Sequence, residues 1–431
     1  MRVLWFTNIL LPDAAAQLGR SSVGSGWWMA ALLERVKQHT HMRLAVITVA
    51  GCKDARFTVD GVEYFVIRRT WRSAILGRLR RPGAYCSSPS QIQRYVSIVR
   101  KWNPDLVHVH GTEQDYGLLK AWGITDIPVI VSIQGLMTPC YRKTFGDLLP
   151  DELSRSFTTR LIGLDSESLY WWKRHRRQAP IEEQILRSAD LILGRTEWDY
   201  ASAWAIQPDL RYHHVDELMR SEFLTTSPWN IEKCHRHQIL CTTASVPAKG
   251  LHVLLEAVWR LRPTYPDIVL NVAASGFAPR FSNDYARFVR DLIERWDLSS
   301  VVRFLGWIDA PELVRRLRAA HCYVTPSFNE NGCNALQEAM LVGTPAIATA
   351  CGGMLTTIEP RRTGLVFPAG DTALLAMQVH RLFQDDQLAQ QIGAQARDVA
   401  RKRHDPQRVE DQLLRAYAEA TSRHGKPETT V

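Results

Sequence analysis

The sequence has 431 residues, 45% of them hydrophobic and 23% charged, with a formal net charge of +9. This length exceeds what one ordinary core supports, so we expect two domains, and the composition excludes a disordered chain. The longest apolar runs fall well short of the ~18 residues that span a bilayer. The excess of positive charge favours anionic partners such as nucleotides or lipid head groups.

The eight cysteines are scattered, with neither a C-x-x-C pair nor a cluster at metal-ligand spacing. This usage predicts reduced thiols and no structural metal. The apolar stretch at the N-terminus is followed by Asp13 and has the pattern of a first strand. We therefore expect no signal peptide, no bound metal or cofactor, and a cytoplasmic location.

Short apolar runs alternate with amphipathic segments along the whole chain, a pattern typical of parallel sheets covered on both faces. Helices are expected at 27–36, 92–102 and 251–261. Expected strands fall in two series: 2–7, 44–50, 63–67, 105–111, 128–135 and 189–196, then 238–244, 268–274, 301–306, 322–327 and 345–350. Two series predict an α/β protein with two doubly wound, Rossmann-like domains. Loops at the carboxyl ends of the strands should carry the function.

The domain boundary is expected in a polar segment that contains Pro228. We assign an N-terminal domain to residues 1–225, a linker to 226–238 and a C-terminal domain to 239–405. A final amphipathic helix at 406–422 is expected to pack back toward the N-terminal domain.

Near the N-terminus, Gly24, Ser25 and Gly26 precede the first long helix. Glycines at such a place let a phosphate or a sugar approach the backbone closely. The spacing is not G-x-G-x-x-G, so a dinucleotide-binding loop is not supported. A merely flexible connection is the alternative.

The segment 68–82 places Trp71, Ile75 and Leu79 on one side of an expected helix, with six arginines in the segment. A second aromatic and basic stretch, "YWWKRHRR", covers 170–177. Basic amphipathic segments favour binding to an anionic membrane surface. A solvated basic face is the alternative, and nucleic acid is disfavoured because no recognised binding module accompanies the charge.

His108 and His110 end a buried strand, on one side of it. They are either core histidines or cleft residues, and no third ligand at a suitable spacing supports a metal. Arg195 follows a later strand in the stretch "LGRTEWD". It either faces a substrate or forms a structural salt bridge.

The stretch "PSFNENGCNALQEAMLVGTPAIATACGG" holds Glu330 and Glu338 on either side of an expected helix start at Asn334, where Asn334 and Gln337 have capping-box spacing. The amides around this start favour an anion, and two carboxylates nearby favour hydroxyl groups. A sugar nucleotide supplies both. The alternative is a solvated loop glutamate and an ordinary first-turn glutamate. The amides expected to form the anion site are those of Gly332, Cys333, Asn334 and Ala335.

Lys249 follows the first strand of the second series and precedes a helix. A lysine at this place can neutralise a departing diphosphate. A single Lys-Gly pair carries little information by itself, because most such lysines are simply exposed.

The order "E-x7-E", "EAM", "GTPAIAT", "GG" and "TGLVFPAGD" resembles the signature of family 4 glycosyltransferases, which have the GT-B fold of two domains facing each other across a cleft. The resemblance covers most of the second domain. The form with Asn334 is similar to branches that build bacterial surface polysaccharides, as are "LGRTEWD" and "HHVDELMRSEF".

The resemblance implies ribose binding by Glu338, sugar binding by Glu330 and a diphosphate contact by Lys249. It implies that His110 lies by the anomeric carbon, and that the glycine loop also contacts substrate. From the resemblance we also expect a nucleotide-sugar donor, a saccharide acceptor and transfer with retention of configuration. The acceptor is expected to be lipid-linked. D-x-D, the metal-binding motif of glycosyltransferases with the other main fold, is absent from the chain, which agrees with transfer without metal.

The sequence departs from the family pattern at two places. An arginine expected five or six residues before Lys249 is replaced by Ala244 and Thr243, and a second cleft histidine is replaced by Gln134. Glutamine can hydrogen-bond to substrate but cannot take a proton. These departures favour the alternative of a non-catalytic GT-B subunit of a glycan assembly complex. A nucleotide-sugar epimerase is a further alternative without specific support.

Overall fold

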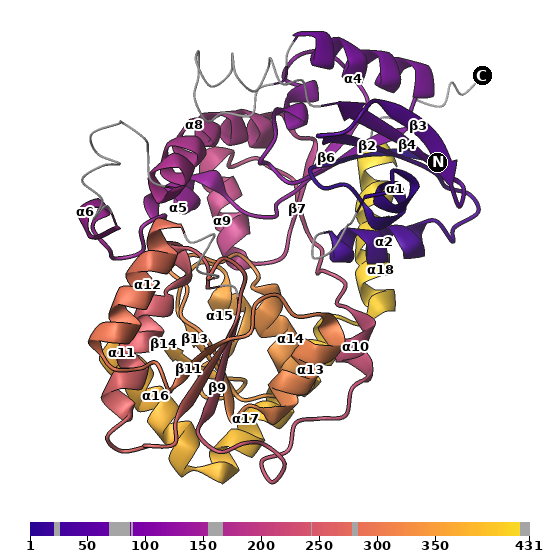
Figure 1. The fold of residues 1–431 in the computed structure, drawn as a ribbon. Helices are drawn as coiled ribbons and strands as arrows, with labels where there is room; N and C mark the ends of the chain where they lie inside the picture. Colours follow the sequence, from indigo (N-terminus) through magenta and orange to yellow (C-terminus); the bar gives the residue numbers. More distant parts are fainter. Residues whose placement is uncertain are drawn as a thin grey trace, which may run out of the picture. The chain divides into compact units, whose positions relative to one another are not determined.

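The computed structural model describes residues 1–20, 26–68, 87, 89–153, 167–242, 244–277 and 283–422. The chain forms two compact units, each built on one sheet (Figure 1). Unit 1 comprises 1–138, 173–218 and 404–431, and unit 2 comprises 139–172 and 219–403. The expected α/β architecture with two doubly wound domains is therefore confirmed.

The sheet of unit 1 has eight strands in the order β3-β4-β2-β1-β5-β6-β7-β8. All neighbours pair in parallel except β3 and β4, which form an antiparallel hairpin at one edge. The sheet is thus mixed, whereas the sequence pattern predicted a parallel sheet. Its strands are β1 (Arg2–Thr7), β2 (Arg43–Ala50), β3 (Ala55–Val59), β4 (Val62–Arg68), β5 (Leu106–His110), β6 (Val129–Ser132), β7 (Leu191–Gly194) and β8 (Tyr212–His214).

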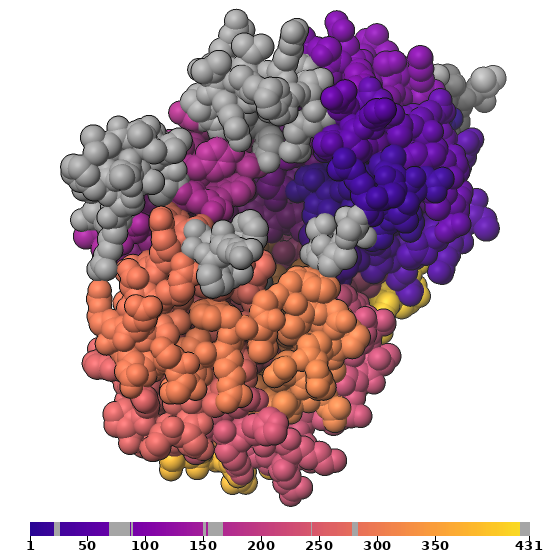
Figure 2. Space-filling view, in the orientation of Figure 1, coloured from indigo at the N-terminus to yellow at the C-terminus, as the bar shows by residue number. Residues whose placement is uncertain are grey.

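The sheet of unit 2 has six parallel strands in the order β11-β10-β9-β12-β13-β14. The strands are nearly all buried, which explains their unbroken apolar runs. The side chains of this unit that lie on the face shown in the space-filling view are coloured pink to orange (Figure 2). The strands are β9 (Gln238–Thr242), β10 (Val269–Ala273), β11 (Val302–Phe304), β12 (Cys322–Thr325), β13 (Ala346–Thr349) and β14 (Leu365–Phe367).

Helices connect the strands in both units. In the first half of the chain they are α1 (Pro12–Gln17), α2 (Trp27–Val36), α4 (Pro89–Trp102), η1 (Asp115–Leu119), α5 (Met137–Arg142), α6 (Pro150–Leu153), α8 (Glu167–Ser188) and α9 (Glu197–Ile206). In the second half they are α10 (Ser221–Thr225), η2 (Pro247–Lys249), α11 (Leu251–Leu261), α12 (Asp284–Arg295), α13 (Ala310–Ala319), α14 (Asn334–Val342), α15 (Met354–Thr357), α16 (Thr372–Gln384), α17 (Asp386–Arg403) and α18 (Pro406–Ser422).

The division of the chain differs from a single boundary near Pro228. Residues 139–172 and 219–225 belong to unit 2, although the sequence assigns them to the N-terminal domain. The last helix, α18, belongs to unit 1 and lies beside α2 there (Figure 1). Its apolar face, with Leu413 and Tyr417, is part of the buried cluster that includes Trp5 of β1. The chain therefore leaves unit 1 and returns to it.

No helix within the described ranges is long and apolar enough to cross a membrane. The seven cysteines within those ranges are all free.

Candidate active site

In unit 2, the carboxyl ends of two neighbouring strands bring Lys249 and Glu330 together. Lys249 ends the short helix η2 after β9, and Glu330 follows β12. The Lys249 Nζ donates to Glu330 Oε1 at 2.5 Å, and the Ser327 hydroxyl donates to the same oxygen at 2.7 Å. Burial opposes the charge of Lys249, but the adjacent carboxylate outweighs this effect and raises the lysine pKa above its ordinary value. At neutral pH Lys249 is therefore protonated.

Two glycines allow the backbone around this ion pair to pack closely. Gly250, after Lys249, has φ of +69°, and a Cβ there would lie 2.1 Å from the carbonyl oxygen of Pro326. A Cβ at Gly352 would lie 1.9 Å from the carbonyl oxygen of Glu330. The neighbouring Gly353 amide donates to that oxygen at 3.0 Å. Only glycine fits such approaches, so both ends of the ion pair are fixed by their main chains.

The helix α14 begins at Asn334, as the sequence predicts, but its start is not a capping box. Cys333 is the N-cap residue and its side chain makes no capping hydrogen bond. The Gln337 amide instead donates to the Thr357 hydroxyl at 3.2 Å. Burial and the charge of the nearby Glu330 raise the pKa of the Cys333 thiol to about 12, so this residue is neutral.

The first-turn amides of α14 have no intrahelical acceptor and therefore favour an anion. Cys333 lies within electrostatic reach of both Glu330 and Lys249. The structure thus brings the amino end of α14, with Gly332, Asn334 and Ala335, to the same place as the ion pair. A cation, helix amides and a carboxylate stand together there, and the cation and the amides favour an anion.

Glu338 lies in the second turn of α14 and is buried, with 3% of its surface exposed. Arg220, just before α10, donates to Glu338 Oε1 through Nε at 2.9 Å and through an Nη at 2.5 Å. Burial raises the pKa of Glu338 to about 7, although Arg220 stabilises the carboxylate. Both arginine bonds go to one oxygen, so the other oxygen can accept from hydroxyls of a ligand.

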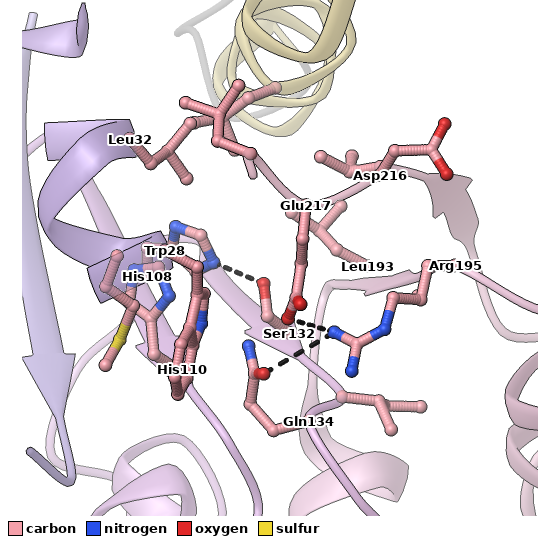
Figure 3. Close-up of a pocket in the computed structure, with 16 residues that line it drawn as sticks. Trp28, Leu32, His108, His110, Ser132, Gln134, Leu193, Arg195, Asp216 and Glu217 are labelled. Atoms are coloured by element: carbon pink, nitrogen blue, oxygen red, sulfur yellow. Dashed lines mark hydrogen bonds and ion pairs between the residues drawn. The ribbon is translucent and has the colours of Figure 1, made fainter. Parts of the chain in front are cut away.

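In unit 1, four neighbouring strands each place a polar residue at their carboxyl ends. His110 ends β5, Gln134 follows β6, Arg195 follows β7 and Glu217 follows β8. Arg195 pairs with Glu217, and its Nη1 lies 3.5 Å from the side-chain oxygen Oε1 of Gln134 (Figure 3). The four residues line one cavity of about 40 Å³.

His110 is held among aromatic rings at the edge of this cavity. The Trp5 ring centroid lies 4.4 Å from that of His110, and His108 lies 3.9 Å away on the same strand. His108 is fixed by Tyr417 Oη at 2.8 Å. It is also fixed by the Ser132 hydroxyl at 2.7 Å (Figure 3). Burial lowers the pKa of His110 to about 3, so its imidazole is neutral at physiological pH. His108 is thus a core histidine, and His110 offers Nε2 as an uncharged hydrogen-bonding group.

The structure brings most of the expected site residues into these two clusters. Gly26 is described, with φ of +77° at the start of α2, whereas Gly24 and Ser25 lie outside the described residues. Ala244, which stands where the family has an arginine, is buried. The segment 68–82 lies outside the described residues beyond Arg68. In "YWWKRHRR" Arg176 is exposed and the other residues are half-buried.

The sequence interpretation did not identify three residues that complete the clusters. Glu217 and Arg220 lie in "HHVDELMRSEF", and Ser327 precedes Glu330 by three residues. Arg195 and Glu338, the partners of Glu217 and Arg220, belong to other elements, whereas Ser327 binds Glu330 within one loop. Spacing alone gives no signal for such long-range ion pairs.

Two doubly wound units with polar side chains at the carboxyl ends of their strands define the GT-B fold. Residues 23–210 match the family "Glycosyl transferase 4-like domain", and residues 231–399 match "Glycosyl transferases group 1". Each half of the chain therefore carries a glycosyltransferase-type domain.

Among curated proteins, the D-inositol 3-phosphate glycosyltransferase of Corynebacterium urealyticum is 33% identical over 138 residues, which are 32% of each chain. The matches with curated relatives span from about a third to a half of those proteins' lengths.

Solved structures resemble the whole chain. Sucrose-phosphate synthase from Thermosynechococcus elongatus has a TM-score of 0.73 at 18% identity, over 98% of this chain and 100% of that one. Anabaena HepE in complex with UDP and glucose has a TM-score of 0.64 at 17% identity, over 97% and 99%. These likenesses support the GT-B fold.

Proposed function

We propose that this protein is a retaining glycosyltransferase that moves a sugar from a nucleotide-diphosphate sugar to a hydroxyl group of a saccharide acceptor. The observation that carries the proposal is the meeting of Lys249, Glu330 and the amino end of α14 in unit 2. A GT-B relative of known structure binds UDP and glucose, which supports a sugar nucleotide as the donor.

In this proposal unit 2 binds the donor. Lys249 and the first-turn amides of α14 hold the diphosphate, Glu338 accepts from the ribose hydroxyls and Glu330 from those of the sugar. As the bond from the anomeric carbon to the phosphate oxygen breaks, the acceptor oxygen bonds to that carbon on the same face. The acceptor proton passes to the departing phosphate. Lysine and amides stabilise the charge that develops there, so no metal is required.

Unit 1 binds the acceptor, with His110, Gln134 and Arg195 at the carboxyl ends of its strands. The basic segment 68–82 supports a lipid-linked acceptor and work at the cytoplasmic surface of a membrane, in the synthesis of a surface polysaccharide.

A second candidate is a non-catalytic subunit with the same fold. The buried Ala244, where the family has an arginine, and Gln134, where it has a histidine, favour this candidate. Such a subunit would bind neither donor nor acceptor productively.

A thermal-shift screen of UDP-, GDP- and ADP-sugars tests the donor proposal. Ligand at about 100 times its Kd stabilises the folded state by about 2.7 kcal/mol, which corresponds to a rise of several degrees in Tm for a unit of this size. Lys249→Ala should abolish the rise, whereas Lys233→Ala, at an exposed lysine of the same unit, should not. A blank across the whole panel with the wild-type chain would favour the non-catalytic subunit.

A further inference from the structure

The cavity in unit 1 is lined by several buried polar atoms that have no protein partner within the described part of the chain. They are His110 Nε2, Arg195 Nε, Glu217 Oε2 and Trp28 Nε1. His110 and Glu217 are more than nine-tenths buried. Because unpaired buried polar groups are costly, their gathering around one cavity indicates a ligand site.

The four atoms offer both donors and acceptors. Arg195 Nε and Trp28 Nε1 donate, Glu217 Oε2 accepts, and neutral His110 Nε2 does either according to its tautomer. Hydroxyl groups are the matching chemistry, because each hydroxyl donates and accepts at once. The cavity is narrow, at about 40 Å³, and so admits hydroxyl groups at the edge of a ring rather than a whole sugar.

The charges around the cavity disfavour an anion. Arg195 is the one cationic residue among those that line it, and its charge is paired with Glu217. His108 and His110 are neutral, since burial lowers the pKa of each. Asp216, a further carboxylate of the lining, is held by His214 at 3.0 Å and by the Gln412 amide, and Arg408 lies 3.8 Å from it. A phosphate would thus have to compete with Glu217, a residue of the same cavity, for Arg195.

We infer that Trp28, His110, Arg195 and Glu217 form a subsite for the hydroxyl groups of an uncharged saccharide, and that Glu217 excludes phosphorylated acceptors by occupying Arg195. This inference rests on the proposed function, in which unit 1 binds the acceptor, and it adds the acceptor's chemical class. Gln134 joins the subsite through its contact with Arg195 (Figure 3).

The test uses the full chain and ligand-observed NMR titrations with methyl glucoside, methyl galactoside and methyl mannoside against the corresponding hexose 6-phosphates. The wild-type chain should bind at least one neutral glycoside and prefer it to its phosphate. Glu217→Gln keeps the shape but removes the charge. It should weaken glycoside binding by about tenfold and should strengthen phosphate binding, because Arg195 is then free to pair.

Glu183→Gln, at an exposed glutamate of α8 in the same unit, is the matched control and should change neither affinity. Wild-type preference for the phosphates, or no binding of any glycoside, would overturn the inference, even if Glu217→Gln fails to fold. The affinity for UDP, GDP and ADP is measured in parallel. If the wild-type chain binds nucleotides but no glycoside, the subsite alone is contradicted, whereas absence of nucleotide binding by the wild-type chain counts against the proposed function.

Discussion

Glu338 shows how a single buried carboxylate can serve a ligand. It lies inside α14 rather than in a loop, and Arg220 occupies only one of its oxygens. Burial without full pairing is costly for stability, and such sites are frequent where a ligand completes the hydrogen bonds. The Glu338 oxygen that does not bind Arg220 is the basis for proposing ribose binding at this position.

Glu338→Gln should weaken the binding of nucleoside diphosphates without unfolding the protein. Loss of a charge-assisted hydrogen bond costs roughly 1.5–3 kcal/mol, which is on the order of a tenfold to hundredfold loss in affinity. Calorimetric titration of both proteins with UDP, GDP and ADP measures this loss of affinity. Glu294→Gln, at an exposed glutamate of the same unit, is the control. Equal affinities of wild type and Glu338→Gln would remove the ribose assignment.

The raised pKa of Glu338 also predicts a pH dependence of stability. Its folded-state pKa of about 7 lies above the ordinary 4.5, so the folded protein binds a proton that the unfolded chain releases between these values. The stability from protonated Glu338 is complete below the lower value and is lost as pH rises through the upper one.

Relative to Glu338→Gln, the wild-type protein without ligand should therefore lose thermal stability between about pH 5 and about pH 8, by on the order of 1–3 kcal/mol. Thermal midpoints of both proteins across this range measure the effect. Parallel curves for the two proteins would show that Glu338 does not titrate as inferred.

At the scale of elements, the site residues lie close together because they follow the carboxyl ends of neighbouring strands. Lys249 and Glu330 lie 81 residues apart in the chain but follow the neighbouring strands β9 and β12. The close approach of Gly250 to Pro326 fixes η2 against the loop that carries Glu330. The glycine is therefore required by packing as well as by its positive φ.

Gly250→Ala should destabilise unit 2 more than Gly306→Ala does. Both glycines have φ near +70°, but a Cβ at Gly306 meets nothing within 4 Å, whereas one at Gly250 meets the Pro326 oxygen at 2.1 Å. The left-handed conformation costs each variant about 1–2 kcal/mol, and the clash should add about 1–3 kcal/mol for Gly250→Ala alone. Thermal midpoints and nucleotide affinity measure the difference. Equal losses in the two variants would mean that the loop moves aside freely.

The same scale shows what the sequence could and could not predict. The apolar runs predicted eleven strands at or near their observed places, because strands of a parallel sheet are buried on both faces and so consist of nearly continuous apolar residues. They did not predict β3, whose residues alternate between half-buried and exposed, although Asp60-Gly61 is a hairpin signal. The short edge strands β8 and β14 have too few residues for a pattern.

For the candidate site, the sequence placed Lys249, Glu330 and Glu338 in the correct unit, because their motif is local. It could not predict Arg220 or Glu217, whose roles depend on a partner brought near by the fold. The capping box at Asn334 was wrong because Thr357, from a later element, binds Gln337 instead. Long-range polar contacts are the part of the site that spacing does not encode.

At the scale of the whole molecule, the chain passes between its two units more than once. Residues 139–172 enter unit 2 early, and α18 returns to unit 1 at the end. There Tyr417 hydrogen-bonds to both Trp5 and His108. The last helix thus supports the strand that carries His110.

The location of the protein is a further whole-molecule prediction. The arginines of segment 68–82 should give salt-sensitive binding to anionic vesicles, each basic residue contributing up to about 1 kcal/mol. Substitution of Arg72, Arg78, Arg80 and Arg81 by glutamate should abolish co-sedimentation with phosphatidylserine vesicles while nucleotide binding is kept. Equal pelleting of the wild type and the variant, or pelleting of neither, would show a plain solvated basic face.

The release of nucleoside diphosphate from a sugar nucleotide, measured in EDTA with and without added saccharide acceptor, tests the central claim most directly. The account predicts release by the wild type that acceptor accelerates, and release slower by about a hundredfold or more in Lys249→Ala, because the departing diphosphate loses its cation. No release by the wild type despite intact binding of sugar nucleotides, or equal rates in the wild type and Lys249→Ala, would contradict it.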